Sequence, residues 1–158
     1  MPDDYGVSPS ARVPALPPTP IDETSMKYIC LGYYDPVKNA AMSEDELDAM
    51  FDECFAYDDH LRESGHYAGG EALQPHDSTL TLYWQNGRVA TTDGPYAETK
   101  EQLGGLLVLE AHDMNHAIQL MSQHPSVKYG SRWEVRPTAD MSAITKASEQ
   151  RRRKPTAR

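Results

Sequence analysis

The chain has 158 residues, of which 39% are hydrophobic and 25% are charged, an ordinary globular composition with room for one domain. No apolar run approaches the roughly 20 residues that span a bilayer, and the first residues lack the hydrophobic stretch of a secretory signal, so we expect no membrane or secreted protein. The net charge of −9 is concentrated in residues 26–140, which carry 8 basic and 19 acidic side chains, so the folded domain is expected not to bind nucleic acid.

The two ends of the chain differ from this acidic middle. Residues 1–25 are rich in proline and short polar side chains, which predicts a disordered N-terminal tail. Residues 138–158 lack an apolar face and end in a basic run, which predicts a flexible basic C-terminal tail. The folded domain is therefore expected over residues 26–137. Cys30 and Cys54 have apolar neighbours and no metal-binding spacing, so we expect buried thiols of a reducing, cytoplasmic compartment.

The elements of this domain can be predicted in chain order. Residues 26–34 are rich in β-formers and end at Asp35-Pro36, a turn signal. Ser43 and Glu46 form a capping box that begins a helix of about 20 residues, which ends near Gly65. Five further strands and a second helix are expected: strands over residues 66–73, 79–84, 88–92, 103–109 and 131–135, with the Asn86-Gly87 hairpin signal between the second and third, and a helix that Asp113 caps and Pro125 ends.

This order predicts an α+β fold, namely a ferredoxin-like βαβ-type sandwich with an added hairpin. Two helices can cover only one face of the sheet. The first strand nevertheless carries apolar side chains on both faces, with Tyr28 and Cys30 on one and Ile29 and Leu31 on the other. The face without helices then needs a cover, and a second copy of the chain is the simplest one. We therefore predict a homodimer.

Residues 93–105, which read Asp-Gly-Pro-Tyr-Ala-Glu-Thr-Lys-Glu-Gln-Leu-Gly-Gly, resemble the signature of the YCII-related, DGPF-type family. Three shorter segments resemble the family in the same order: residues 26–28, 70–75 and 134–137. The resemblance covers residues 26–137. It implies a ferredoxin-like domain that dimerises as an α/β barrel, with a cleft between sheet and helices.

The resemblance implies different functions for different relatives. Some are thought to be enzymes, including a dehydrochlorinase of chlorinated aromatic breakdown, and others occur beside or fused to extracytoplasmic-function sigma factors. The usual phenylalanine of the signature is Tyr96 here. Wider relatives are credited with a His–Asp pair whose histidine lies near the middle of the first helix, where this chain reads Phe51-Asp52-Glu53-Cys54. A histidine-based mechanism is therefore not favoured for this chain.

Charged residues of the signature are the first candidates for chemistry. Asp93 or Glu98 could act as a general base, with Lys100 binding an anionic substrate. The structural alternative, a turn with ion pairs, is favoured by the residue types. Glu71 follows two glycines at a strand end, where its carboxylate could point into the cleft beside Asp93 or remain an ordinary surface acid.

Three further side chains are candidates for substrate binding. Tyr96 and Trp84 could line an aromatic-binding pocket, and His60 could reach the cleft, although aromatic side chains at strand spacing are commonly core and histidines commonly exposed. His124 is near a helix C-terminus, where it suits the helix dipole without a function. No metal site and no cofactor are expected.

Two functions remain open. One is a homodimeric, cytoplasmic domain that binds a small polar or aromatic molecule, with cofactor-free acid–base chemistry (elimination or hydrolysis) if it is an enzyme. The other is a regulatory module that contacts a sigma factor or similar protein. An enzyme is expected to hold at least two of Asp93, Glu71 and Glu98 in a concave pocket, whereas an interaction module leaves them solvated.

Overall fold

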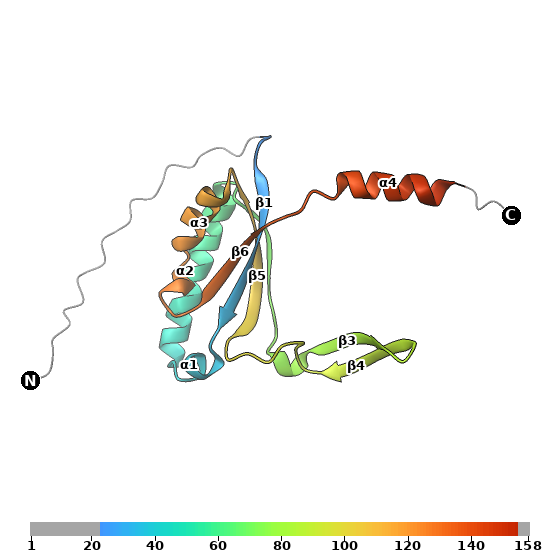
Figure 1. Ribbon diagram of the computed structural model, residues 1–158. Helices are drawn as coiled ribbons and strands as arrows, with labels where there is room; N and C mark the ends of the chain where they lie inside the picture. Colours follow the sequence, from blue (N-terminus) through green and yellow to red (C-terminus); the bar gives the residue numbers. More distant parts are fainter. Residues whose placement is uncertain (1–22, 155–158) are drawn as a thin grey trace, which may run out of the picture.

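The computed structural model describes residues 23–154 (Figure 1). Most of the predicted N-terminal tail therefore lies outside the described residues. The elements in chain order are β1 Met26–Tyr34, α1 Pro36–Ala40, α2 Glu44–Glu63, β2 Tyr67–Ala72, the 3₁₀ helix η1 His76–Ser78, β3 Leu80–Gln85, β4 Arg88–Asp93, β5 Gln102–Ala111, α3 Met114–Ser122, the 3₁₀ helix η2 Pro125–Val127, β6 Arg132–Pro137 and α4 Ser142–Arg153.

Four strands form one antiparallel sheet in the order β2-β5-β1-β6. Helices α2 and α3 cover one face of this sheet, and the other face carries no helix (Figure 1). Among the described residues, strands β3 and β4 pair only with each other, as a second, two-stranded sheet. The prediction of an α+β chain with antiparallel sheets is confirmed. None of the described helices is both long and apolar enough to span a bilayer.

The core lies between the sheet and these two helices. Strand alternation directs Tyr28 and Cys30 of β1 and Leu107 and Leu109 of β5 toward the helices, where Leu61 of α2 is fully buried against them. Burial raises the pKa of the Cys30 thiol to about 12, so the thiol stays protonated. Both cysteines are free; Cys30 is buried as predicted, whereas Cys54 is only half-buried because it faces the cleft.

Three predicted local features are confirmed: the capping box, the Asp113 cap and the Asn86-Gly87 turn. The Ser43 Oγ accepts from the Glu46 N–H at 3.2 Å, and a Glu46 carboxylate oxygen accepts from the Ser43 N–H at 2.8 Å, which closes the capping box. Asp113 caps α3 by accepting from the His116 N–H. Asn86 and Gly87 both have positive φ, 53° and 72°, as a type I′ hairpin turn requires.

Three features differ from the sequence prediction. Asp35-Pro36 starts the short helix α1, because the Asp35 carboxylate accepts from two backbone N–H groups and proline fits the first helical position. The β3–β4 hairpin projects away from the main sheet (Figure 1). Residues 142–153, within the predicted C-terminal tail, form α4, which buries none of its side chains and so gave no apolar periodicity to detect.

Candidate active site

A cleft of about 510 Å³ lies between the sheet and α2. Its walls come from the end of β1, from α1 and α2, from β2 and β5, and from the segment between α3 and β6. This volume lies within the range of about 300–1,000 Å³ that is usual for small-molecule sites. Most of the wall is apolar or aromatic, including Met50, Phe51, Phe55 and Trp133.

His124 lies between the end of α3 and the start of η2, and its side chain is only 6% exposed. Its Nδ1 accepts from the Ser126 N–H at 3.3 Å and so caps η2. The Ser126 hydroxyl lies 2.7 Å from the same nitrogen. The Ser126 oxygen also accepts from the Trp133 Nε1–H at 2.9 Å, which leaves its own hydrogen free to point at His124.

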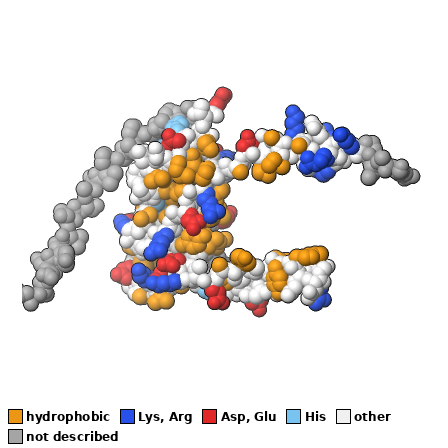
Figure 2. Space-filling model, viewed as in Figure 1, with side chains coloured by type: hydrophobic (Ala, Val, Ile, Leu, Met, Phe, Trp, Pro, Cys, Tyr) orange, Lys and Arg blue, Asp and Glu red, His pale blue; other side chains and the backbone are white. Residues whose placement is uncertain are grey.

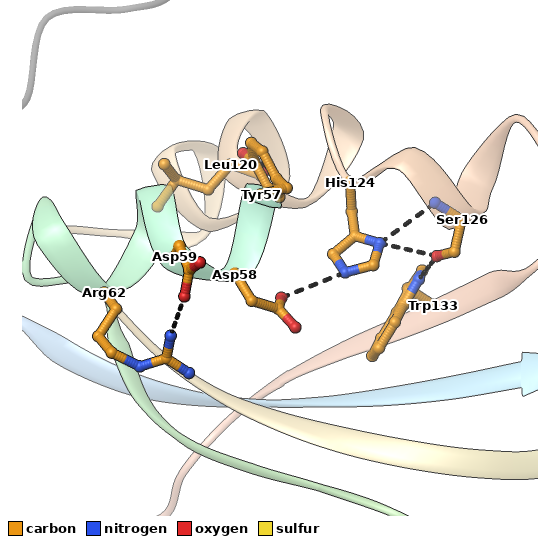
Figure 3. A network of polar contacts seen from close by, with 8 residues as sticks. All are labelled: Tyr57, Asp58, Asp59, Arg62, Leu120, His124, Ser126 and Trp133. Atoms are coloured by element: carbon orange, nitrogen blue, oxygen red, sulfur yellow. Dashed lines mark hydrogen bonds and ion pairs between the residues drawn. The ribbon is translucent and has the colours of Figure 1, made fainter. Parts of the chain in front are cut away.

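These donors determine where the proton of a neutral His124 lies. Because Nδ1 accepts from a backbone N–H, the proton must be on Nε2. Nε2 faces Asp58 of α2, with 3.5 Å between Nε2 and Asp58 Oδ1 (Figure 3). The rings of Tyr57 and Trp133 contact the imidazole from other sides, with centroid distances of 5.7 and 5.1 Å. The histidine is therefore fixed in both orientation and tautomer.

Asp58 is the charged group of this network that reaches the cleft. Its side chain is 24% exposed, but its Oδ1 is buried and accepts no hydrogen bond. Burial raises the pKa of the neighbouring Cys54 thiol, and the Asp58 charge raises it further, so a thiolate nucleophile is disfavoured. Burial, followed by the Asp58 charge, raises the pKa of Tyr57 to about 12; its hydroxyl donates to the Leu120 carbonyl and ties α2 to α3.

Asp35, which caps α1, and Lys38 of α1 lie in the wall at one end of the cleft. Burial of the Asp35 carboxyl opposes ionisation, but the N–H groups of Lys38 and Val37 and the charge of Lys100 outweigh it and lower its pKa. Lys100 Nζ is 3.6 Å from Asp35 Oδ2. Within residues 23–154, Lys38 lines the cleft without a carboxylate at ion-pair distance, and no group of His, Cys, Asp or Glu is arranged to hold a metal ion.

The structure brings only Glu71 of the three predicted catalytic carboxylates to the cleft wall, and that side chain is exposed. Asp93, at the end of the projecting hairpin, and Glu98 are exposed and do not line the cleft. Their catalytic role stays a prediction without support from this geometry.

The predicted binding residues lie outside the cleft as well. Tyr96 is 94% exposed and Trp84 72% exposed. His60 is exposed on α2, where its ring contacts Tyr57. Lys100 is held by Asp35. None of the four lines the cleft.

The pair that does meet in the cleft, Asp58 and His124, was not singled out from the sequence. The middle of the first long helix contains no histidine, and the histidine that faces it comes from the segment after α3. Nothing in a single sequence links two positions 66 residues apart. The sequence offers one local signal for His124, namely that it comes directly before Pro125 and two residues before Ser126. This pattern is typical of a side chain that caps a short helix.

The family model of the YCII-related domain matches residues 26–142, which is most of the chain and nearly all of the folded part. The chain belongs to the YCII-related domain family. An uncharacterized protein of Rhizobium meliloti (strain 1021) is 32% identical over 118 residues, which is 72% of this chain and 93% of the relative. The signature resemblance is thus confirmed at the level of family.

Proposed function

We propose that this YCII-related domain binds a small amphipathic molecule in the cleft and carries out cofactor-free acid–base chemistry on it, with Asp58 as the proton-transferring group. The supporting observation is the buried Asp58 Oδ1, which accepts no hydrogen bond and faces a fixed imidazole in the wall of a cleft of ligand size. A carboxylate in that setting is costly unless a donor or cation reaches it.

Each residue of the network has a distinct task in this proposal. Asp58 contacts the bound molecule and takes a proton from it. His124 is a positioning residue, because its Nε2–H faces the carboxylate. Ser126 and Trp133 hold the imidazole in the productive tautomer. The apolar wall keeps water away, which strengthens these interactions.

The cleft also limits the class of substrate. Aromatic and aliphatic side chains form most of the wall, so the bulk of the ligand is expected to be apolar. Lys38 supplies a cation at the end of the cleft formed by α1, whereas Lys100 is engaged by Asp35. A small aromatic or branched carboxylate would match both features. In an elimination, Asp58 would take a proton from the carbon beside that carboxylate, the electron pair of this C–H bond would form the C=C bond, and the leaving group would depart from the next carbon with the electrons of its own bond.

The test is a thermal-shift screen of small aromatic and aliphatic carboxylates and phenols, followed by activity assays on every compound that stabilises the protein. Asp58→Asn keeps the shape of the side chain and removes the base, so compounds should still bind while turnover falls by about 10²-fold or more. Asp59→Asn is the matched control, because Asp59 is the adjacent carboxylate of the same helix, points out toward Arg62 and is 69% exposed (Figure 3).

The results separate the parts of the proposal. Turnover that falls in Asp58→Asn but not in Asp59→Asn supports the assignment of the base. Turnover that is unchanged in Asp58→Asn shows that another group carries the chemistry. A screen without any compound whose binding is altered by substitutions in the cleft would contradict the small-molecule proposal as a whole.

A second candidate function is a regulatory protein-interaction module, with an extracytoplasmic-function sigma factor as the expected type of partner. The observation in its favour is the exposure of Asp93, Glu98 and Glu71, since an interaction module is expected to leave these carboxylates solvated. We rank this function second because the cleft contains another carboxylate, Asp58, that has a buried oxygen. A ligand screen that finds no binding compound would favour the protein-interaction function.

We also propose the quaternary structure and location expected from the family. The sheet order β2-β5-β1-β6 supports a ferredoxin-like fold. On its open face Ile29, Leu31, Leu106 and Val108 are only half-buried, which supports a second copy packed there to give the dimeric α/β barrel. The two free cysteines support a reducing, cytoplasmic location.

A further inference from the structure

Two elements of the chain stand away from the domain on the same side. The β3–β4 hairpin and α4 both project from the face of the sheet that carries no helix, and they leave an open space between them (Figure 1). An isolated two-stranded hairpin is marginally stable in water, and so is an isolated helix of fewer than about 12–15 residues. Both elements therefore need something to pack against.

The hairpin has a face that is suited to such packing. Leu80, Leu82 and Trp84 alternate along β3 on one side, and Val89 of β4 is paired with Trp84 on that same side. These four side chains are 61%, 69%, 72% and 58% exposed. Figure 2 shows hydrophobic side chains along the hairpin, including its edge toward α4. A contiguous apolar face of this kind marks an interaction surface.

We infer that the hairpin and α4 are two arms that clasp a second copy of this chain. The inference rests on the proposed dimer and adds to it which elements hold the partner. Packed sheets stand about 10 Å apart, whereas a 12-residue helix is about 18 Å long and six-residue strands reach about 20 Å. Arms of this length pass the partner's sheet and reach its helical layer.

Charge identifies the surface that α4 would meet. The last turn of α4 carries Arg151, Arg152 and Arg153, and Figure 2 shows Lys and Arg side chains along this arm. Helix α2, in the helical layer, carries nine carboxylates against one arginine. The basic end of one copy's α4 thus complements the acidic α2 of the other, and the same contact is made twice by a two-fold axis.

The test measures the dimer dissociation constant of the full chain by analytical ultracentrifugation. Leu82→Glu and Trp84→Glu, each alone, should raise it at least about 30-fold if these side chains are buried in the partner. Thr92→Glu is the matched control, because Thr92 is exposed on the opposite face of the same hairpin, paired with Thr81. Charge reversal of Arg151, Arg152 and Arg153 should also raise the dimer dissociation constant, and this increase should be smaller at high salt.

A second measurement does not depend on how the variants fold. A photo-cross-linking amino acid at position 84 in an equal mixture of ¹⁴N- and ¹⁵N-labelled chains should give cross-links between light and heavy peptides. Cross-links that join only peptides of the same label, or a dissociation constant equally affected by Thr92→Glu, would overturn the clasp. A dimer unaffected by any arm variant would overturn the clasp but leave the dimer proposal standing. A wild-type chain that is monomeric at high concentration would overturn both.

Discussion

Replacement of Ser126 by alanine tests whether the polar chain behind Asp58 is as tightly held as its geometry indicates. The hydroxyl oxygen accepts from the Trp133 indole N–H at 2.9 Å, and the hydroxyl lies 2.7 Å from His124 Nδ1. Ser126→Ala removes both contacts. His124 keeps the Ser126 backbone N–H, but the indole N–H, on a half-buried ring, loses its acceptor. Leaving one such donor unpaired and losing one hydrogen bond should together lower the free energy of unfolding by about 2 kcal/mol.

For a domain of this size, such a loss corresponds to a drop in Tm of about 6–8 °C. Urea unfolding followed by tryptophan fluorescence measures it, at one fixed protein concentration because a dimer would make the result concentration-dependent. Ser122→Ala is the control, since Ser122 is exposed on α3 and bonds only the Gln119 carbonyl. If both variants lose less than about 0.5 kcal/mol, the proposed orientation of His124 by Ser126 is wrong.

Three further variants test the fold around the site. Gly105→Ala would place a Cβ 2.9 Å from the Glu71 carbonyl oxygen of the paired strand, so it should cost about 1–3 kcal/mol in urea unfolding. Ser43→Ala opens the capping box of α2 and should cost about 1 kcal/mol, with a matching loss of Tm. Burial and then the neighbouring imidazoles lower the pKa of His116 below its ordinary 6.5, so the unfolded chain binds more protons and stability falls as the pH drops below that value. His116→Gln should therefore reduce the difference in unfolding free energy between pH 8 and pH 5.5.

The sequence predicted those parts of the fold that local chemistry determines. The Ser43–Glu46 pair specified the start of α2, and Asn86-Gly87 specified the hairpin turn, because each depends on groups within four residues of one another. Strand alternation correctly predicted two-sided apolar strands. No pattern in the sequence indicated α4, because its side chains are all partly or fully exposed. Asp35-Pro36 was predicted as a turn, whereas in the structure Asp35 caps α1 and Pro36 is its first residue.

The candidate site was less predictable because its residues meet only through tertiary structure. The signature segment is the most distinctive stretch of the sequence, and its carboxylates therefore drew attention first. In the structure that segment connects the projecting hairpin to β5, and Lys100 serves to hold Asp35 at the start of α1. Asp58 and Asp59 are adjacent on a strongly acidic helix. They differ only in tertiary packing, because Asp58 faces His124 of the segment after α3, whereas Asp59 is exposed and pairs with Arg62.

The buried oxygen of Asp58 is the main support for the proposed function. Of the other eight carboxylates of α2, one closes the capping box, one pairs with Lys128 and one with Arg62, and the rest need no explanation beyond solubility. Asp58 alone has a buried oxygen that accepts no hydrogen bond in the part of the chain described. Such an arrangement works against stability, and an uncharged side chain of the same shape would relieve it. This buried oxygen, beside an imidazole of fixed tautomer and in the wall of an apolar cleft, is the basis of our proposal that Asp58 transfers protons.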